Sequence, residues 1–164
     1  MRTGRMVAVG GARVAAAVMV LGAVAGPARA VPVAAAPAEA DVAYHGQVSL
    51  AAGLLGISLL PENHGPAALV NATVRLRLSV PLADAQQLAA GCARAGERVL
   101  VCETGALPVS GKGRRIEVAL VLKERPAEAV VRIDTWWNGG AVDSDLKNNE
   151  HAVLALDTGD SYVF

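Results

Sequence analysis

The sequence contains two cysteines, Cys92 and Cys102, with nine residues between them. Two thiols at such a spacing can form a disulfide, share a metal ion or act as a redox pair. The chain opens with an export signal, described below, and exported proteins fold where disulfides form. We therefore predict a disulfide that closes a β-hairpin, with its turn at residues 93–97. In the chain-entropy estimate, so short a loop contributes about 3 kcal/mol.

The three histidines, His45, His64 and His151, are the other side chains that commonly bind transition metals. Zinc sites combine histidine and cysteine at short, fixed spacings, and these five residues match none of them. Each histidine lies beside a predicted turn or strand end, so we interpret all three as solvated loop residues. The sequence predicts neither a metal site nor a cofactor.

Residues 143–149 are rich in oxygen-bearing side chains, the ligand type that calcium prefers. The segment lacks the glycine and the closing glutamate of an EF-hand loop, and we interpret it as an ordinary turn. No serine lies in a G-x-S-x-G context, and no group of residues suggests a nucleophile with a base and an oxyanion hole. We predict that the protein is not an enzyme and has no catalytic residues.

Two adjacent tryptophans, Trp136 and Trp137, lie in a stretch that alternates apolar and polar residues. Neighbouring residues of a strand point to opposite faces, and the alternation predicts Trp137 inside and Trp136 outside. An exposed Trp136 beside Arg132 and Asp134 is a candidate contact surface for a protein or a sugar ring. The alternative is an indole that lies flat against a neighbouring strand.

Residues 1–30 have the composition of a secretory signal peptide. Three arginines precede an apolar stretch at residues 14–25, and Ala28-Arg29-Ala30 is a small-x-small cleavage site. The apolar stretch is too short for a membrane-spanning helix, which needs about 20 residues. We expect cleavage after Ala30 and release into the extracellular medium, with no membrane association afterwards.

Removal of this segment changes the charge of the chain. The precursor has 15 basic and 15 acidic residues, and residues 1–30 hold four arginines and no acid, so 11 basic and 15 acidic residues remain. A net charge of −4 argues against nucleic acid as a partner. The excess of arginine over lysine, twelve against three, is typical of a high-GC actinomycete.

An Ala/Pro-rich segment at residues 31–42 follows the signal, and we interpret it as a flexible arm. The alternative is that the arm docks into a partner protein as an added strand, which would make Val31 and Val33 partner-binding residues. The remaining residues, 43–164, form the predicted folded domain.

The domain reads as a series of short strands in which apolar and polar residues alternate. Internal glycines favour one or two strands over a helix in the first of these segments, residues 82–90 are predicted as a short helical turn, and the aromatic C-terminus is expected to tuck against the sheet. Six or seven strands with frequent turns indicate an all-β, two-sheet β-sandwich. The predicted strand segments are 47–60, 70–80, 98–103, 115–122, 128–138 and 151–157.

Several motifs occur in a fixed order along the domain. They are Asn63-His-Gly65-Pro66-Ala67, Gly91-Cys92 with Val101-Cys102, Gly105-Ala-Leu107-Pro108, and Asn148-Asn149 before the last strand. This order resembles the bacterial repeat domain called domain of unknown function 11 and the related cell-adhesion immunoglobulin-like domains, over about residues 54–156. The single copy and the Trp136-Trp137 pair depart from the family pattern. The resemblance implies an immunoglobulin-like sandwich of about seven strands with an adhesive or spacer role and no catalytic residues.

These observations predict a secreted, non-enzymatic protein–protein interaction module whose partners are other secreted or surface proteins. A lone domain with an N-terminal arm is similar in organisation to the small linker subunits of secreted actinomycete toxin particles, which suggests an adaptor. The alternative is an adhesin-like or carbohydrate-binding module, which an exposed Trp136 in a polar, concave face would favour. A small secreted enzyme or inhibitor would need a polar cleft that the sequence does not indicate.

Overall fold

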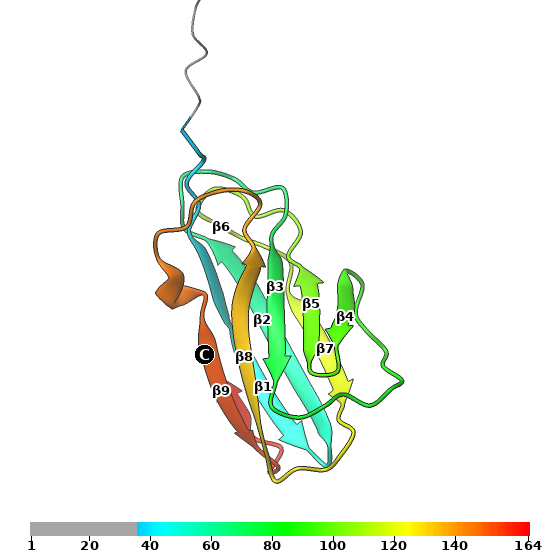
Figure 1. Ribbon diagram of the computed structural model, residues 1–164. Helices are drawn as coiled ribbons and strands as arrows, with labels where there is room; N and C mark the ends of the chain where they lie inside the picture. Colours follow the sequence, from blue (N-terminus) through cyan, green and yellow to red (C-terminus); the bar gives the residue numbers. More distant parts are fainter. Residues whose placement is uncertain (1–35) are drawn as a thin grey trace, which may run out of the picture. The chain divides into compact units, whose positions relative to one another are not determined.

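A computed structural model describes residues 36–164 of the chain. The expected signal peptide and the first part of the expected arm, including Val31 and Val33, lie outside the described residues. The described part is all-β and consists of two five-stranded sheets, and Figure 1 shows the sheet that contains β3 and β8 lying over the sheet that contains β1 and β2. This confirms the predicted all-β, two-sheet class.

The first sheet is built around the long hairpin of β1 and β2. Strand β10 pairs with the free edge of β1, and both β7 and β6 pair with the other edge of β2. All of these pairings are antiparallel. The strands are β1 (Val42–Ala51), β2 (Leu54–Asn63), β6 (Gly111–Lys112), β7 (Ile116–Val121) and β10 (Ser161–Val163).

The second sheet has the strand order β4-β5-β3-β8-β9, and all of its pairings are antiparallel. Strand β3 therefore lies at its centre between β5 and β8, and β4 and β9 form its edges. A single 3-10 turn, η1 (Leu146–Asn148), precedes β9. The strands are β3 (Thr73–Leu78), β4 (Cys92–Gly96), β5 (Val99–Glu103), β8 (Glu128–Trp137) and β9 (His151–Leu156).

The segment expected to form one or two strands at residues 47–60 belongs to two, joined by a two-residue turn. Ala52 and Gly53 both have positive φ, 51° and 83°, as the tight turn of a twisted hairpin requires. Gly56 lies in an unbroken β1–β2 ladder, and no bulge interrupts the hairpin there.

The core lies between the two sheets, and the predicted alternation places its residues. In β7 every second residue from Ile116 is buried, and β3, β5 and β9 follow the same rule. The core is mainly aliphatic, with Tyr44 as its one fully buried aromatic side chain among the described residues. The predicted helical turn at residues 82–90 is wrong, because Leu82 and Ala83 instead donate backbone hydrogen bonds to the distant Glu97 and Val121.

The predicted disulfide is confirmed, and it joins neighbouring strands. Cys92 and Cys102 lie directly opposite each other in β4 and β5, with their Cα atoms 4.0 Å apart. The hairpin turn lies at residues 97–98 and not at 93–97, because residues 93–96 continue β4. An irregularity of the ladder between Arg94 and Gly96 accommodates the extra residue.

Backbone hydrogen bonds hold both ends of the described segment to the domain. Ala40 donates a backbone hydrogen bond to Val142, and Val142 donates one to Ala38. Residues 38–42, which the sequence assigned to the arm, therefore belong to the folded domain. At the other end, Phe164 exchanges two backbone hydrogen bonds with Gly46, so the aromatic tail does tuck against the sheet, as an additional strand.

Candidate functional site

The outer face of β3 and β8 gathers most of the residues that the sequence singled out. Alternation in β3 turns Arg75 and Arg77 outward while the residues between them enter the core. In the β3–β8 ladder, Arg75 lies opposite Asp134 and Arg77 lies opposite Arg132. Side chains that are directly opposite share one face of a sheet, so the two strands bring three arginines and one aspartate together.

Asp134 binds the arginines of β3 and is not itself open to a partner. Arg75 donates from Nε to Asp134 Oδ1 at 2.9 Å and from Nη2 to Oδ2, and Arg77 donates from Nη2 to Oδ2 at 2.9 Å. Asp134 is only 8% exposed. Its hydrogen bond to Arg75 is the main reason why the pKa of that guanidinium is raised. From the sequence we expected Asp134 on the contact surface. In the structure its carboxylate instead orients the two arginines of β3.

Trp136 and Trp137 are both exposed, so the predicted burial of Trp137 is wrong. The β3–β8 ladder pairs Val74 with Thr135 and Thr73 with Trp137, which leaves Trp136 as the extra residue of a β-bulge. The bulge shifts Trp137 by one position, to the outward-facing Thr73. Thr135 still points inward, where its Oγ1 lies 2.8 Å from the hydroxyl of Tyr44.

Trp136 is held in place although its side chain is 60% exposed. The guanidinium carbon of Arg75 lies 4.6 Å from the centre of the Trp136 ring, which is a cation–π contact. The indole thus leans on a neighbouring strand and still presents a large apolar surface. A rigid aromatic group of this kind loses little conformational entropy when a partner binds.

A hollow of about 260 Å³ lies beside the two indoles. Asp143 forms part of its wall, but its carboxylate already accepts hydrogen bonds from the backbone N–H groups of Val42 and Asp145 and from the Asn149 side chain. Residues 143–149, which we expected to form an ordinary turn, are thus stabilised by the carboxylate of Asp143. The residues that line the hollow are Thr135, Trp136, Trp137, Asn138, Asp143, Leu146 and Asn149.

Arg132 is exposed and forms no ion pair with any of residues 36–164. Asp134 pairs with Arg75 and Arg77, whereas Arg132 lies beside Glu150 in a shallow depression that also includes Arg77. The structure therefore unites Arg132, Asp134 and Trp136, as the sequence expected, and adds Arg75, Arg77 and Trp137. The alternation of β3 could have predicted the two added arginines. Nothing in the sequence indicates the bulge at Trp136 that turns Trp137 outward.

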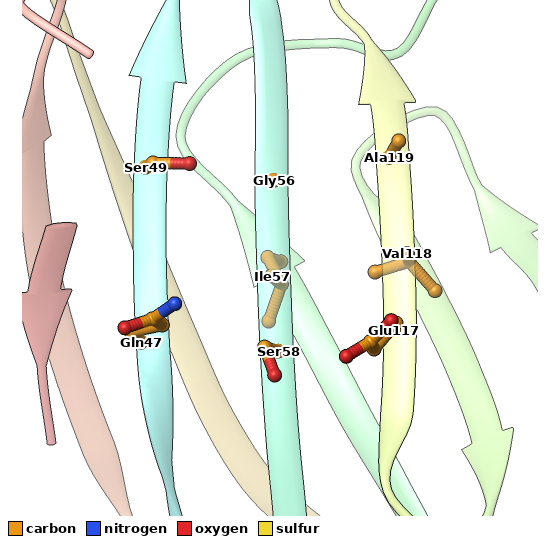
Figure 2. Close-up of a pocket in the computed structure, with 8 residues that line it drawn as sticks. All are labelled: Gln47, Ser49, Gly56, Ile57, Ser58, Glu117, Val118 and Ala119. Atoms are coloured by element: carbon orange, nitrogen blue, oxygen red, sulfur yellow. The ribbon is translucent and has the colours of Figure 1, made fainter. Parts of the chain in front are cut away.

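A second depression, of about 340 Å³, lies on the outer face of the other sheet. Small residues of β1, β2 and β7 create it, and Figure 2 shows Ser49 and Glu117 extending toward the middle strand on either side of Gly56 and Ser58. Its polar groups are spread over three strands and do not converge on one point. It offers a shallow polar surface with a poorer anchor for a ligand than the indole face.

Two of the three histidines lie close together, contrary to the interpretation of scattered loop residues. The β1–β2 hairpin brings His45 and His64 to one place together with Glu62. His151, by contrast, begins β9 and packs against the ring of Phe164, with ring centres 5.1 Å apart.

Comparisons with protein-family models, with curated proteins and with solved structures found no match to this chain. Within residues 36–164, no helix is long and apolar enough to cross a membrane.

Proposed function

We propose that the protein is a secreted, non-enzymatic interaction module that binds another exported protein through the outer face of β3 and β8. The observation that carries this proposal is the exposed Trp136, fixed by Arg75 beside Arg132, which pairs with no acidic residue of the described range 36–164. Tryptophan and arginine are the residues most enriched at the energetic centres of protein interfaces. The exposed guanidinium of Arg132 suits a partner surface that offers a carboxylate.

The proposal includes an immunoglobulin-like sandwich of the kind found in adhesive domains. The order β1-β2-β7 in one sheet and β3-β8-β9 in the other corresponds to the A-B-E and C-F-G strands of immunoglobulin-like domains. This strand order supports the resemblance to domain of unknown function 11, and with it an adaptor or spacer role between exported proteins.

Affinity purification of tagged residues 31–164 from the culture supernatant of the source organism, followed by mass spectrometry, tests the proposal. The unaltered protein should retain a specific partner, and Trp136→Ala should raise the Kd by about 30-fold or more, as the loss of a central interface residue does. Leu54→Ala is the matched control, since Leu54 is 49% exposed but lies on the other sheet. Recovery of no stable partner, or equal retention by Trp136→Ala, would refute the proposal.

The arm needs a separate variant. Deletion of residues 31–35 removes the part of the expected arm that precedes the hydrogen-bonded residues 38–42. If a partner accepts the arm as an added strand, this deletion should weaken partner binding. Trp136→Ala should then reduce partner binding without abolishing it. Unchanged binding after the deletion would rule out strand donation.

Carbohydrate binding is the second candidate, because the hollow beside Trp136 and Trp137 combines indole rings with polar groups. A sugar ring would stack on an indole and bond to the polar wall. Retention of the protein on cell-wall polysaccharide, abolished by Trp137→Ala, would favour this candidate over a protein partner.

A further inference from the structure

We propose that His45, Glu62 and His64 form a Zn²⁺-binding site on the outer face of the β1–β2 hairpin. This site is on the sheet that does not contain Trp136, and it is independent of the proposed partner-binding face. Imidazole and carboxylate are the ligand types of zinc sites with three protein ligands, which leave one position open to water.

The hairpin register is what brings these three residues together. The turn at Ala52 and Gly53 places Leu60 opposite His45 and Glu62 opposite Ala43. His64 directly follows the last residue of β2 and continues the same alternation, and its backbone N–H donates to the carbonyl of Asp41 at 2.7 Å. Positions two apart on a strand share a face, so the three candidate ligands project to the same side.

The distance between the ligand atoms of Glu62 and His64 fits a tetrahedral ion. Zn–N and Zn–O bonds of about 2.0–2.1 Å place two ligand atoms about 3.3 Å apart. His64 Nε2 lies 3.3 Å from Glu62 Oε2, and one ligand atom from each of the three residues lies within 4.8 Å of the others. His45 is exposed, so its side chain is free to rotate toward the other two ligands.

A carboxylate stands behind His64, as in many zinc sites. Asp41 Oδ2 lies 4.0 Å from Nδ1 of His64, on the side of the ring away from Glu62, and Asp41 Oδ1 accepts a hydrogen bond from the Asn148 side chain at 2.6 Å. This distance is too long for a hydrogen bond, but a carboxylate beside Nδ1 favours the tautomer with the proton on Nδ1 and the lone pair on Nε2. Asp41 is thus a positioning residue for the proposed site.

The backbone that carries His64 is itself held firmly. Asn63 is fully buried, and its Oδ1 accepts hydrogen bonds from the N–H groups of Asp41 and Gly65. Its Nδ2 donates to the carbonyl oxygens of Ala67 and Pro108. The residue between two candidate ligands is therefore rigid, and rigid elements hold metal ligands more accurately than mobile loops.

Lys112 provides a specific test of the proposed zinc site. Its Nζ lies 3.0 Å from Glu62 Oε1, opposite the oxygen that faces His64. The ammonium competes with a bound cation for the same carboxylate and repels it. Removal of this charge should therefore tighten zinc binding, whereas a nonspecific surface cluster of histidines would not respond to Lys112.

Isothermal titration calorimetry of untagged residues 31–164 with ZnCl₂ tests the site. One ion should bind per chain, with no comparable heat from MgCl₂. His45→Ala, His64→Ala and Glu62→Gln should each weaken binding by about 100-fold or more, and Asp41→Asn by about 10-fold, as the loss of an outer-shell partner does. Lys112→Gln should bind several-fold more tightly, and His151→Ala should bind as the unaltered protein does.

NMR spectra keep this test independent of folding defects. Dispersed amide signals show that each variant is folded, and zinc should shift the imidazole signals of His45 and His64 but not those of His151. Absence of saturable binding to the folded protein, or equal binding by the folded His45→Ala and His64→Ala variants, would overturn the proposal. Either result would leave the partner-binding proposal untouched, because Trp136 lies on the other sheet.

Discussion

The guanidinium of Arg75 lies 4.6 Å from the centre of the Trp136 ring and binds the carboxylate of Asp134 through two nitrogens. One side chain thus links the exposed indole to a nearly buried charge. Because the carboxylate fixes the guanidinium, it also fixes the indole that leans on it. The bulge, the ion pair and the exposed ring therefore form one surface and not three separate features.

Asp134→Asn should lower the free energy of unfolding by about 1.5–3 kcal/mol, because it removes charge-assisted hydrogen bonds from two arginines. Urea denaturation of residues 31–164 measures this change. Glu128→Gln on the same strand is the control and should change stability by less than about 0.5 kcal/mol, since Glu128 is exposed. A loss no larger than that of the control would show that the ion pair contributes nothing.

Loss of the disulfide should cost about 3 kcal/mol, the loop-closure entropy for a sequence separation of 10. The double variant Cys92→Ala/Cys102→Ala should unfold at a correspondingly lower urea concentration. A reducing agent should shift the unaltered protein in the same direction and leave the double variant unchanged. Thiol titration of the denatured, unreduced protein should detect no free thiol, and two free thiols would contradict the bond.

Ala52→Asn should stabilise the protein by about 0.5–1 kcal/mol. Ala52 has a φ of 51° in a two-residue turn, and asparagine before glycine is favoured in such turns. Gly53→Ala should act in the opposite direction, because Gly53 has a φ of 83° and an added Cβ would lie 3.0 Å from Arg125 Cγ. Thermal unfolding ranks the three proteins, and the reverse order would contradict the assigned turn.

Tyr44 should make the fold sensitive to alkali. Burial raises the pKa of Tyr44 above its ordinary value of 10.0, although the hydrogen bond with Thr135 acts in the other direction. In the unfolded chain this phenol ionises near pH 10, so its contribution is fully present below pH 10 and is lost as the pH rises further. Each pH unit above 10 should cost about 1.4 kcal/mol.

Tyr44→Phe isolates this effect, since the variant lacks the phenol but keeps every other titrating group. At pH 7 it should be less stable by about 1 kcal/mol, the value of a typical hydrogen bond. Urea unfolding between pH 8 and pH 11 should show that the difference from the unaltered protein shrinks above pH 10. A constant difference over this range would refute the assignment.

Strand alternation predicted the inward faces of β3, β5, β7 and β9, because a strand with one buried face repeats every two residues. The alternation predicted the wrong face where the register of the β3–β8 ladder shifts. The bulge at Trp136 adds one residue without any change in composition, so Trp137 faces outward although the pattern places it inside. Strand β6 has only two residues, too few for a pattern to show.

Long-range contacts account for the remaining differences. Residues 82–90 have a helix-compatible sequence, yet the backbone of Leu82 and Ala83 bonds to the turn after β4 and to the end of β7. The cluster of His45, Glu62 and His64 was missed for a related reason. Its residues become neighbours only once the turn at Ala52 and Gly53 fixes the register of the hairpin, and an alanine at the first turn position gives little sign of it.

The disulfide between β4 and β5 also has a mechanical consequence. When a protein is pulled from its ends, the chain between two bonded cysteines cannot extend. A separation of 10 residues corresponds to about 33–36 Å of extended chain. Forced unfolding of single molecules should therefore release a contour length that is shorter by this amount than after reduction. A domain that joins other proteins under load would thus keep one hairpin closed after every other strand has been stretched.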